Sequence, residues 1–420
     1  MKIIVCLLLS FDLFINIQAQ PIGFKTEAIK AAGRGDYPAA IKLLEEAEKQ
    51  NPNDPEIYYY LGVFLHYLAY DSIPMIGYEV SYTNKVLPYF EKAIELKPDY
   101  GDAYYFIGAQ YGAAALDALQ NQNSKEYVSA FKNAFNKGAF PSWLIEYNKN
   151  ILKSCETNSI LFIAGDAEFD ALQYLQVVEH YRKDVSVVIF PFLQRPWYVQ
   201  TLKLGFSNVL RKVPISLSKN QIMSLHPFKW DTLSVNIPIS KNLKEKYQLE
   251  DSQVMKWEID PDLNSKYKSY LGAQLVVLLN IIEANNWKRP INFTLGFEPS
   301  TLSGLNNYFQ LSGIVNKLLP IKTINTTYKI NSSKIEEILL STENIKKLKE
   351  IEKHNMPRVS NIVSNYYNVL YFLADFYKAH NQIEKIKHLS SYIKKYMITD
   401  SLEYGKKILP IIEGLSKNDK

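Results

Sequence analysis

Three acidic side chains follow a short apolar run near the middle of the chain. The run at 159–164 predicts a β-strand, Gly165 and Asp166 interrupt it, and Glu168 and Asp170 come directly afterwards. Carboxylates this close together at the start of a helix could bind a cation or act in general acid–base catalysis. They could also serve structure alone, with Asp166 as the helix N-cap and the other acids favourable in the first turn. We favour the structural interpretation, because capping alone accounts for an aspartate at this position.

A second polar pair precedes the next apolar run of the chain. Arg182 and Asp184 stand just before residues 185–192, which are apolar and rich in β-branched side chains. The pair could form an ion pair that ties the preceding helix to the strand. Alternatively, Arg182 could bind an anion, since a guanidinium group recognises carboxylate and phosphate through paired hydrogen bonds.

Arginine and aromatic residues occur together at two further places. Arg195, Trp197 and Tyr198 follow the second apolar run, and Trp287 and Arg289 end a predicted helix. Arg289 could bind the last carbonyl groups of that helix, with Trp287 packed over the joint. Alternatively, these side chains could form a surface for a sugar or a peptide, because aromatic faces stack on both.

Other catalytic signatures are absent from the sequence. The six histidines show no metal-binding spacing, and Gly165 is not part of a GxGxxG motif. Cys155 has no paired cysteine, and no Gly-x-Ser-x-Gly sequence occurs. The sequence therefore predicts no cofactor and no metal site, and it favours a binding protein over an enzyme.

The candidate residues around Gly165 require a βαβ unit to position them. Two continuous apolar strands joined by a helix predict parallel strands that are covered on both faces. Further along, we expect a weak strand at 213–217, a helix at 267–283, a strand at 291–295 and an amphipathic helix at 307–318. The segment 324–333 predicts an edge strand or a loop. Together these elements predict a small Rossmann-like α/β domain at 150–330, followed by a helical region at 334–420.

A repeated motif precedes this domain. Its first copy contains Gly35-Asp36-Tyr37 and Ala47, and its later copies place alanine at Ala93 and Ala134. Small residues let the two helices of a hairpin approach closely, while larger ones fill the gap between them. The pattern resembles the tetratricopeptide repeat, although its spacings of 46 and 41 residues exceed the usual value of about 34. Such repeats at 20–140 could bind a polypeptide on their inner face or could only support the domain behind them.

Composition and the amino terminus indicate an exported protein. The chain has 420 residues, 47% hydrophobic content and a net charge of +5, with lysines scattered rather than clustered, so no nucleic-acid partner is expected. Lys2 and the apolar run that follows it predict a signal peptide at 1–19, cut after Ala19. The mature chain would then retain Cys155 alone and have no transmembrane segment. We expect a periplasmic or secreted protein.

Three blocks of the central region share their order and spacing with a known family. The blocks are Ile160-Leu161-Phe162 with Gly165-Asp166, Trp197-Tyr198, and Asn286-Trp287-Lys288-Arg289-Pro290-Ile291. They resemble the soluble C-terminal region of bacterial membrane proteins related to protein O-mannosyltransferases. This chain differs after Gly165-Asp166 and lacks the membrane domain that would hold the catalytic carboxylate. The resemblance therefore implies a fold and a cell-envelope context, but not transferase activity.

These observations predict an exported, non-catalytic binding or scaffolding protein of the cell envelope. Its partner would be a protein or peptide, or else a glycan, held by the repeats or at the Gly165 edge of the sheet. The alternative is a soluble accessory protein or an enzyme of envelope protein glycosylation that acts through Asp166, Arg182 and Arg289.

Overall fold

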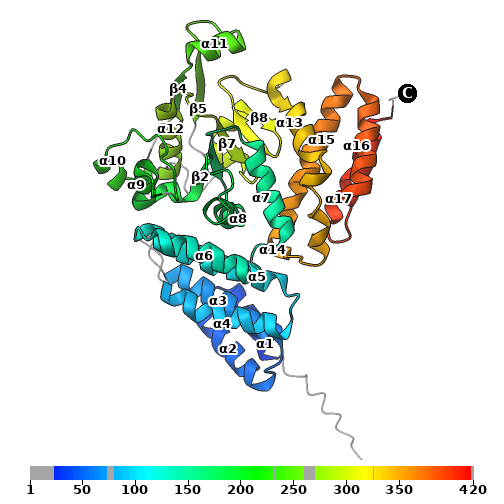
Figure 1. Ribbon diagram of the computed structural model, residues 1–420. Coiled ribbons are helices and arrows are strands. Elements are labelled where there is room, and N and C mark those ends of the chain that lie inside the picture. The colour runs from blue at the N-terminus through cyan, green and yellow to red at the C-terminus, as the bar shows by residue number, and fades with distance from the viewer. Residues whose placement is uncertain are drawn as a thin grey trace, which may run out of the picture.

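The computed structural model describes residues 23–72, 80–207, 209–229, 232–259, 270–324 and 326–417. The predicted signal peptide at 1–19 lies outside this part of the chain. The described residues form an arm of helical hairpins, a central mixed sheet with flanking helices, and a C-terminal group of helices, as the sequence predicts (Figure 1).

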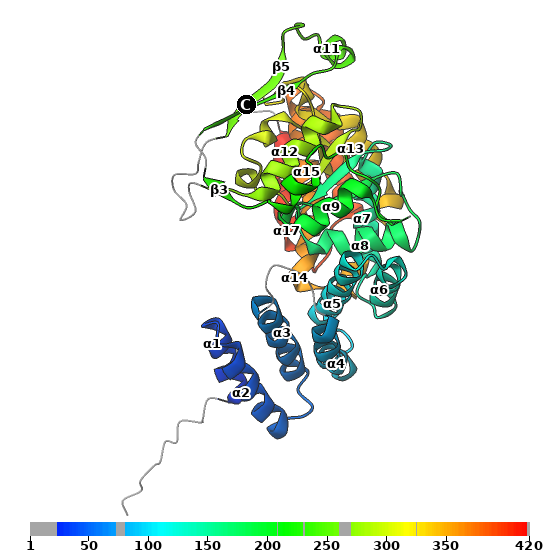
Figure 2. The same cartoon turned by 90° about the vertical axis from the view of Figure 1, so that its left-hand side faces the viewer.

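The arm consists of helices that pack against one another in chain order. They are α1 (Phe24–Gly33), α2 (Tyr37–Gln50), α3 (Pro55–Ser72), α4 (Val80–Leu96), α5 (Gly101–Gln120) and α6 (Ser124–Asn136). A Cβ atom at Gly62 would lie 2.7 Å from the ring of Phe90, so glycine is what lets α3 approach α4 this closely. Figure 2 shows α1 to α4 projecting away from the rest of the molecule.

The last hairpin of the arm packs on the α/β domain through α8 (Asp166–Val177). The rings of Phe135 and Tyr174 stack with centroids 4.5 Å apart, and Tyr127 donates a hydrogen bond of 2.9 Å to Gln173. Both Tyr127 and Gln173 are fully buried. The hairpin α5–α6 therefore supports the α/β domain, while the earlier hairpins extend from it.

The central sheet has six strands in the order β10-β8-β9-β7-β1-β2. They are β1 (Ile160–Ile163), β2 (Ser186–Ile189), β7 (Ile291–Thr294), β8 (Phe309–Ser312), β9 (Val315–Leu318) and β10 (Ile330–Asn331). β1 pairs in parallel with both β2 and β7, which confirms the predicted βαβ unit, and β9 runs antiparallel to β7.

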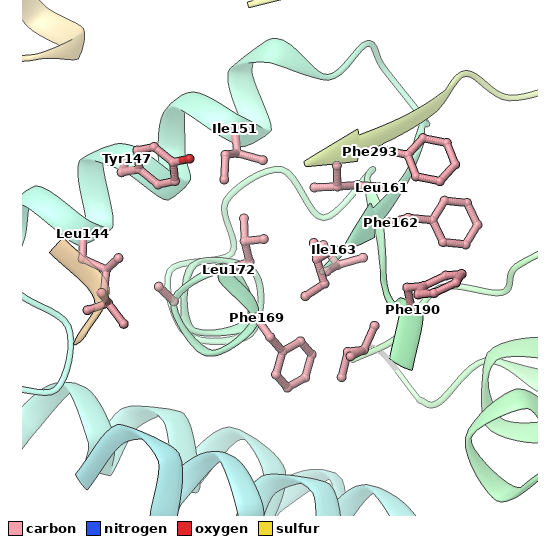
Figure 3. Packing of buried hydrophobic residues seen from close by; sticks show 14 of the residues in the cluster. Leu144, Tyr147, Ile151, Leu161, Phe162, Ile163, Phe169, Leu172, Phe190 and Phe293 are labelled. Atoms are coloured by element: carbon pink, nitrogen blue, oxygen red, sulfur yellow. The ribbon is translucent and has the colours of Figure 1, made fainter. Parts of the chain in front are cut away.

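Strand β1 is covered on both faces, as its continuous apolar sequence predicts. Leu161 and Ile163 point toward α7 (Ser142–Ser154) and α8, where Figure 3 places them beside Ile151 and Leu172. Phe162 points to the opposite face of the sheet and stacks on Phe293 with a centroid distance of 5.0 Å (Figure 3).

The remaining elements of the α/β domain lie around this sheet. The helices are α9 (Pro196–Leu204), α10 (Lys219–Met223), α11 (Lys241–Tyr247) and α12 (Ala273–Asn285), and a 3-10 helix, η1 (Phe190–Gln194), follows β2. Strands β4 (Leu233–Pro238) and β5 (Val254–Ile259) form an antiparallel hairpin, and β3 (Phe228–Lys229) pairs with β6 (Tyr270–Leu271).

The helix predicted at 307–318 is wrong, because residues 309–318 form the hairpin β8–β9. Ser312 pairs with Val315, so Gly313 and Ile314 make a two-residue turn. Gly313 has φ of +61°, which glycine adopts without strain and which suits such hairpins. Residues 213–217 form no strand, and the helix predicted from 267 begins only at Ala273.

The C-terminal region is helical and closes against α7. It contains α13 (Ser332–Leu339), α14 (Pro357–Ser360), α15 (Ser364–Ala379), α16 (Ile383–Tyr396) and α17 (Glu403–Leu415). Between α13 and α14, residues 341–356 form short 3-10 turns and loops. This stretch and Arg358 of α14 lie against α7 and the arm; we call residues 341–358 the connecting segment.

Candidate functional site

The predicted site at Gly165 lies at the edge of the sheet where β1, β2 and β7 end. Gly165, rather than Asp166, is the N-cap residue of α8, and Asp166 is the first helical residue. The interpretation of Asp166 as the N-cap is therefore wrong; its side chain lies outside the described part of the structure. A Cβ atom at Gly165 would meet nothing within 4 Å, so this end of the sheet is locally open.

Glu168 is the buried carboxyl group of this edge. It is 3% exposed, and its Oε2 accepts a hydrogen bond of 2.7 Å from Thr294 at the end of β7. Its Oε1 is buried and has no hydrogen-bond partner among the described residues. Burial raises the pKa of Glu168 to about 7, with the Thr294 hydroxyl and the Ala164 backbone opposing the shift only in part.

Asp170 points to a different neighbour. A Cβ atom at Gly112 of α5 would lie 2.5 Å from Oδ1 of Asp170, so this carboxylate faces the arm while Glu168 faces β7. In the described residues, no group of three or more histidine, cysteine, aspartate or glutamate side chains is arranged to hold a metal ion. Glu168 and Asp170 of α8 therefore face different neighbours, β7 and the arm.

Arg182 and Asp184 form the predicted ion pair, and Arg182 also closes the end of α7. The guanidinium donates to both oxygens of Asp184, at 2.8 and 2.9 Å. It also donates to the carbonyls of Leu152, Cys155 and Glu156. The Arg182 guanidinium lowers the pKa of Asp184 to about 2. Because these donors are all engaged, the arrangement fits a structural tie and leaves little for an external anion.

Arg289 binds a strand rather than the end of its own helix. It donates to the carbonyls of Asn158 and Ser159, just before β1, and to the Ser186 hydroxyl at the start of β2. The end of α12 is closed instead by Asn286 in the left-handed conformation, so the helix-capping interpretation of Arg289 is wrong. Burial lowers the pKa of Arg289 to about 10.

The aromatic residues predicted to accompany Arg289 lie apart. The indole of Trp287 donates a hydrogen bond of 2.7 Å to the carbonyl of Pro238, at the end of β4. Arg195 and Trp197 follow η1, and the Arg195 guanidinium lies 5.2 Å from the ring centroid of Phe192. Trp197 is half-buried, and its indole nitrogen has no hydrogen-bond partner among the described residues.

The predicted site residues therefore separate into two groups at opposite edges of the parallel strands. Residues that follow the strands lie at one edge: Gly165, Asp166, Glu168, Arg195 and Trp197. Residues that precede the strands lie at the other: Arg182, Asp184, Trp287 and Arg289. Because strands of this length span more than 10 Å, no single site contains Asp166, Arg182 and Arg289, and the predicted surface of Trp287 and Arg289 with Trp197 is not assembled.

A contact that the sequence did not predict joins the connecting segment to the arm. The Arg358 guanidinium lies 4.9 Å from the ring centroid of Phe106 on α5 and donates to the hydroxyls of Tyr59 and Tyr67 on α3, at 3.1 and 3.4 Å. The backbone N–H of Arg358 donates 3.0 Å to Asp102. An aromatic cage on the arm thus already holds an arginine of this chain.

The backbone before Arg358 also approaches the arm closely. A Cβ atom at Gly101 would lie 1.7 Å from the carbonyl oxygen of Asn355, so only glycine permits this approach. The indole of Trp143 donates 2.8 Å to the carbonyl of His354. Tyr59 and Arg358 are 299 residues apart in sequence, and no local spacing could have indicated this contact.

Comparison with protein families gives two matches. Residues 33–67 match a model described as a TPR repeat, which agrees with the tetratricopeptide-like pattern predicted for the arm. Two overlapping stretches, 145–260 and 226–337, match a model described as TMEM260-associated domain 2. No curated protein matches the chain.

These findings define a helical-repeat protein with an attached α/β domain. Its TPR repeat indicates a protein-binding role, and its central region is similar to TMEM260-associated domain 2. The relation to protein O-mannosyltransferase-like membrane proteins stays an expectation, since the matched description names TMEM260 alone. None of the helices in the described residues is long and apolar enough to cross a membrane.

Proposed function

We propose that this chain is a non-catalytic binding protein whose arm holds an extended segment of a partner polypeptide. The surface involved is the face of α3 and α5 that carries Tyr59, Tyr67 and Phe106. The α/β domain and the C-terminal helices fix the base of the arm. We further propose that the protein acts after export, in the cell envelope or outside the cell, on the strength of the signal peptide predicted at 1–19.

One observation carries the proposal: this face already holds a side chain of the connecting segment, that of Arg358. Arg358 occupies the aromatic cage, and its backbone N–H donates to the carboxylate of Asp102. Arginine over an aromatic ring contributes roughly 0.5–2 kcal/mol, depending on how far it is removed from water. Tyr67 of the cage and Tyr60, which contacts Tyr59, are half-buried and suit contact with a peptide because they combine a ring with a hydroxyl.

The arrangement of the arm supports this role. Its first four helices project from the body of the molecule (Figure 2). The enzymatic alternative requires Asp166, Arg182 and Arg289 to act together, and these residues lie at opposite edges of the sheet. An accessory role in glycosylation rests on the sequence resemblance alone, so polypeptide binding is the function that the geometry supports best.

Selection from a random peptide library tests the proposal. A phage-displayed library of 12-residue peptides is selected on the chain from residue 20 onward, and the affinity of the enriched peptides is then measured by fluorescence polarisation. We expect enriched peptides to contain arginine. Arg358→Ala should raise their affinity, because it empties the cage, and Tyr67→Ala should lower it by about tenfold.

Lys92→Ala provides the matched control, since Lys92 of α4 forms only a partly exposed pair with Glu95. Its effect should stay below twofold. The proposal fails if neither the wild-type chain nor Arg358→Ala enriches peptides, or if the enriched peptides bind Tyr67→Ala as tightly as the wild type.

A further inference from the structure

A cavity of about 800 Å³ lies where the arm, α7 and the connecting segment meet. The arm contributes Tyr104 and Phe135, α7 contributes Glu146 and Asn150, and the connecting segment contributes residues 343–356. Cavities of this size at the junction of structural units are common ligand sites. The residues described above at either edge of the sheet do not line it.

Two side-chain oxygens beside this cavity are buried and lack hydrogen-bond donors. Asn150 is fully buried; its amide nitrogen donates to the carbonyl of Asn344 and to the hydroxyl of Tyr366, but its Oδ1 has no partner among the described residues. The Oδ1 of Asn355, on the facing connecting segment, is also buried and has no partner in the part of the chain that the structure describes. Buried polar atoms are nearly always hydrogen-bonded, so both oxygens call for donors from water or a ligand.

A buried carboxyl group also lines the cavity. Glu146 is 9% exposed, and its Oε1 accepts a hydrogen bond of 2.9 Å from the backbone N–H of Lys347. Glu146 and Asn150 are four residues apart on α7 and therefore share one helix face. The cavity thus has three oxygen-bearing side chains from two facing elements.

The cavity lining holds as many acids as lysines, so its formal charges balance: Asp99, Glu146, Glu179, Glu343 and Glu350 against Lys149, Lys153, Lys346, Lys347 and Lys353. Lys149 pairs with Glu179 at 2.8 Å, Lys346 pairs with Glu343 at 2.8 Å, and Lys347 pairs with Glu350. The Ser142 hydroxyl also donates to Glu350. A cavity that binds a phosphate or another strong anion would instead carry an excess of cations over acids.

The remaining wall is aromatic and apolar. Phe135 is 41% exposed although it stacks on Tyr174, and Tyr104 and Ile145 also line the space. An aromatic ring with one open face beside hydrogen-bonding oxygens suits a ligand that has both C–H faces and hydroxyl groups.

We propose that this cavity binds a neutral, polyhydroxylated ligand, that is, a sugar or the terminal residues of a glycan. Hydroxyl groups supply the donors that Asn150 and Asn355 lack, and they can both donate to and accept from Glu146. The neutrality of the ligand follows from the paired charges, and a stacked sugar ring covers Phe135. The residues that hold Arg358, namely Tyr59, Tyr67 and Phe106, do not line this cavity.

A glycan array followed by titration calorimetry tests the proposal. The chain from residue 20 onward is applied to neutral and acidic glycans linked through their reducing ends, and the best neutral oligosaccharide is then titrated in free form. We expect binding of neutral glycans. Asn355→Leu should weaken it at least tenfold without lowering the unfolding temperature, because that oxygen accepts no hydrogen bond from the described residues. Asn355→Asp, which keeps acceptor oxygens, should stay within about threefold of wild type.

Asn306→Leu is the matched control, because Asn306 lines a second cavity, beside α15, and its loss should leave binding unchanged. Binding of linked glycans but not free sugars would support the proposal and identify a glycoconjugate as the source. The proposal is overturned if only acidic glycans bind, if no glycan binds, or if Asn355→Leu binds as tightly as the wild type.

Discussion

Replacing Arg182 should destabilise the fold more than replacing any exposed charge. Its guanidinium joins three carbonyl groups at the end of α7 to the Asp184 carboxylate ahead of β2. Less than a third of either side chain is exposed, at 23% for Arg182 and 31% for Asp184. Arg182→Ala leaves the carbonyls and the carboxylate without their donor, so we expect a loss of roughly 3–5 kcal/mol, as for other ion pairs broken on one side.

Two other substitutions of Arg182 separate the effect of its hydrogen-bond geometry from the effect of its backbone conformation. Arg182→Lys keeps the charge but cannot make the paired contact with Asp184 or reach all three carbonyls, so it should cost about 2 kcal/mol. Arg182 has φ of +47°, a left-handed conformation that glycine tolerates better than alanine. Arg182→Gly should therefore be more stable than Arg182→Ala by about 1 kcal/mol.

The pH dependence supplies a second readout. The pKa of Asp184 is lowered to about 2 in the folded protein, so its stabilising contribution is present above the unfolded value of 3.8 and is lost as the pH falls through 2. Allowing for solvent screening, the contribution is about 1–2 kcal/mol and should be roughly halved by pH 3. Arg182→Ala should lack this acid dependence, so the difference from wild type narrows in acid.

Urea unfolding followed by circular dichroism, at pH 7 and pH 3, measures both effects. Arg34→Ala is the control, because Arg34 is exposed and should change the free energy of unfolding by less than about 0.5 kcal/mol. The reasoning is refuted if Arg182→Ala costs less than 1 kcal/mol at pH 7, or if its difference from wild type is as large at pH 3 as at pH 7.

Three further substitutions test individual contacts by unfolding measurements. Glu168→Gln should stabilise the protein by about 1–3 kcal/mol at pH 8 and much less at pH 5. The reason is that the pKa of Glu168 is raised to about 7 in the folded protein, so the wild type loses folding stability as the pH rises from 4.5 through 7. Equal effects at both pH values would contradict this. Gly313→Ala should lower the free energy of unfolding by more than 2 kcal/mol, because the added Cβ would lie 2.2 Å from the Ser154 hydroxyl and the backbone has a φ of +61°. As a control, Gly414 lies in open space within α17, so Gly414→Ala should raise the free energy of unfolding by about 0.5 kcal/mol. Arg289→Lys should cost about 2 kcal/mol by losing the forked contacts to the start of β1, and a neutral result would show that these contacts are dispensable.

The elements that sequence could predict are those whose pattern is set by their own burial. β1 and β2 are continuous apolar runs because both faces of a central parallel strand are covered, and this is visible in the sequence. The sequence of the hairpin β8–β9 also predicts a helix. Its apolar residues at 308, 309, 311, 314, 315 and 318 fit a helical period as well as two short strands. Only Ser312-Gly313 indicates the turn, and one glycine does not exclude a helix.

The site was harder to predict than the fold because it depends on contacts distant in sequence. Arg182 and Arg289 precede β2 and β7, whereas Asp166 follows β1, and the sequence alone does not show that this places them at opposite edges of the sheet. Residues that precede a four-residue strand and residues that follow it lie at opposite ends of the strand and cannot meet. The contact of Arg358 with Tyr59 crosses 299 residues, so it was accessible only from the structure.

We expect each of the two proposed ligands to affect the binding of the other through the connecting segment. Arg358, in the aromatic cage, and Asn355, beside the cavity, are three residues apart, and Asn355 is held by its close approach to Gly101. A partner peptide that displaces Arg358 must loosen this backbone and thereby disturb the cavity. A saturating neutral oligosaccharide should therefore weaken binding of an arginine peptide by about fivefold or more, and the peptide should weaken sugar binding by the same factor.

The variant Arg358→Ala decides whether the connecting segment carries this coupling. With the cage already empty, the peptide has nothing to displace, so its affinity should be the same with and without sugar. Fluorescence polarisation of the peptide at zero and saturating oligosaccharide measures how far the sugar changes peptide affinity, in the wild-type chain and in Arg358→Ala. The coupling is refuted if the oligosaccharide leaves the affinity of the wild-type chain for the peptide unchanged, and coupling that persists in Arg358→Ala would place its origin elsewhere in the junction.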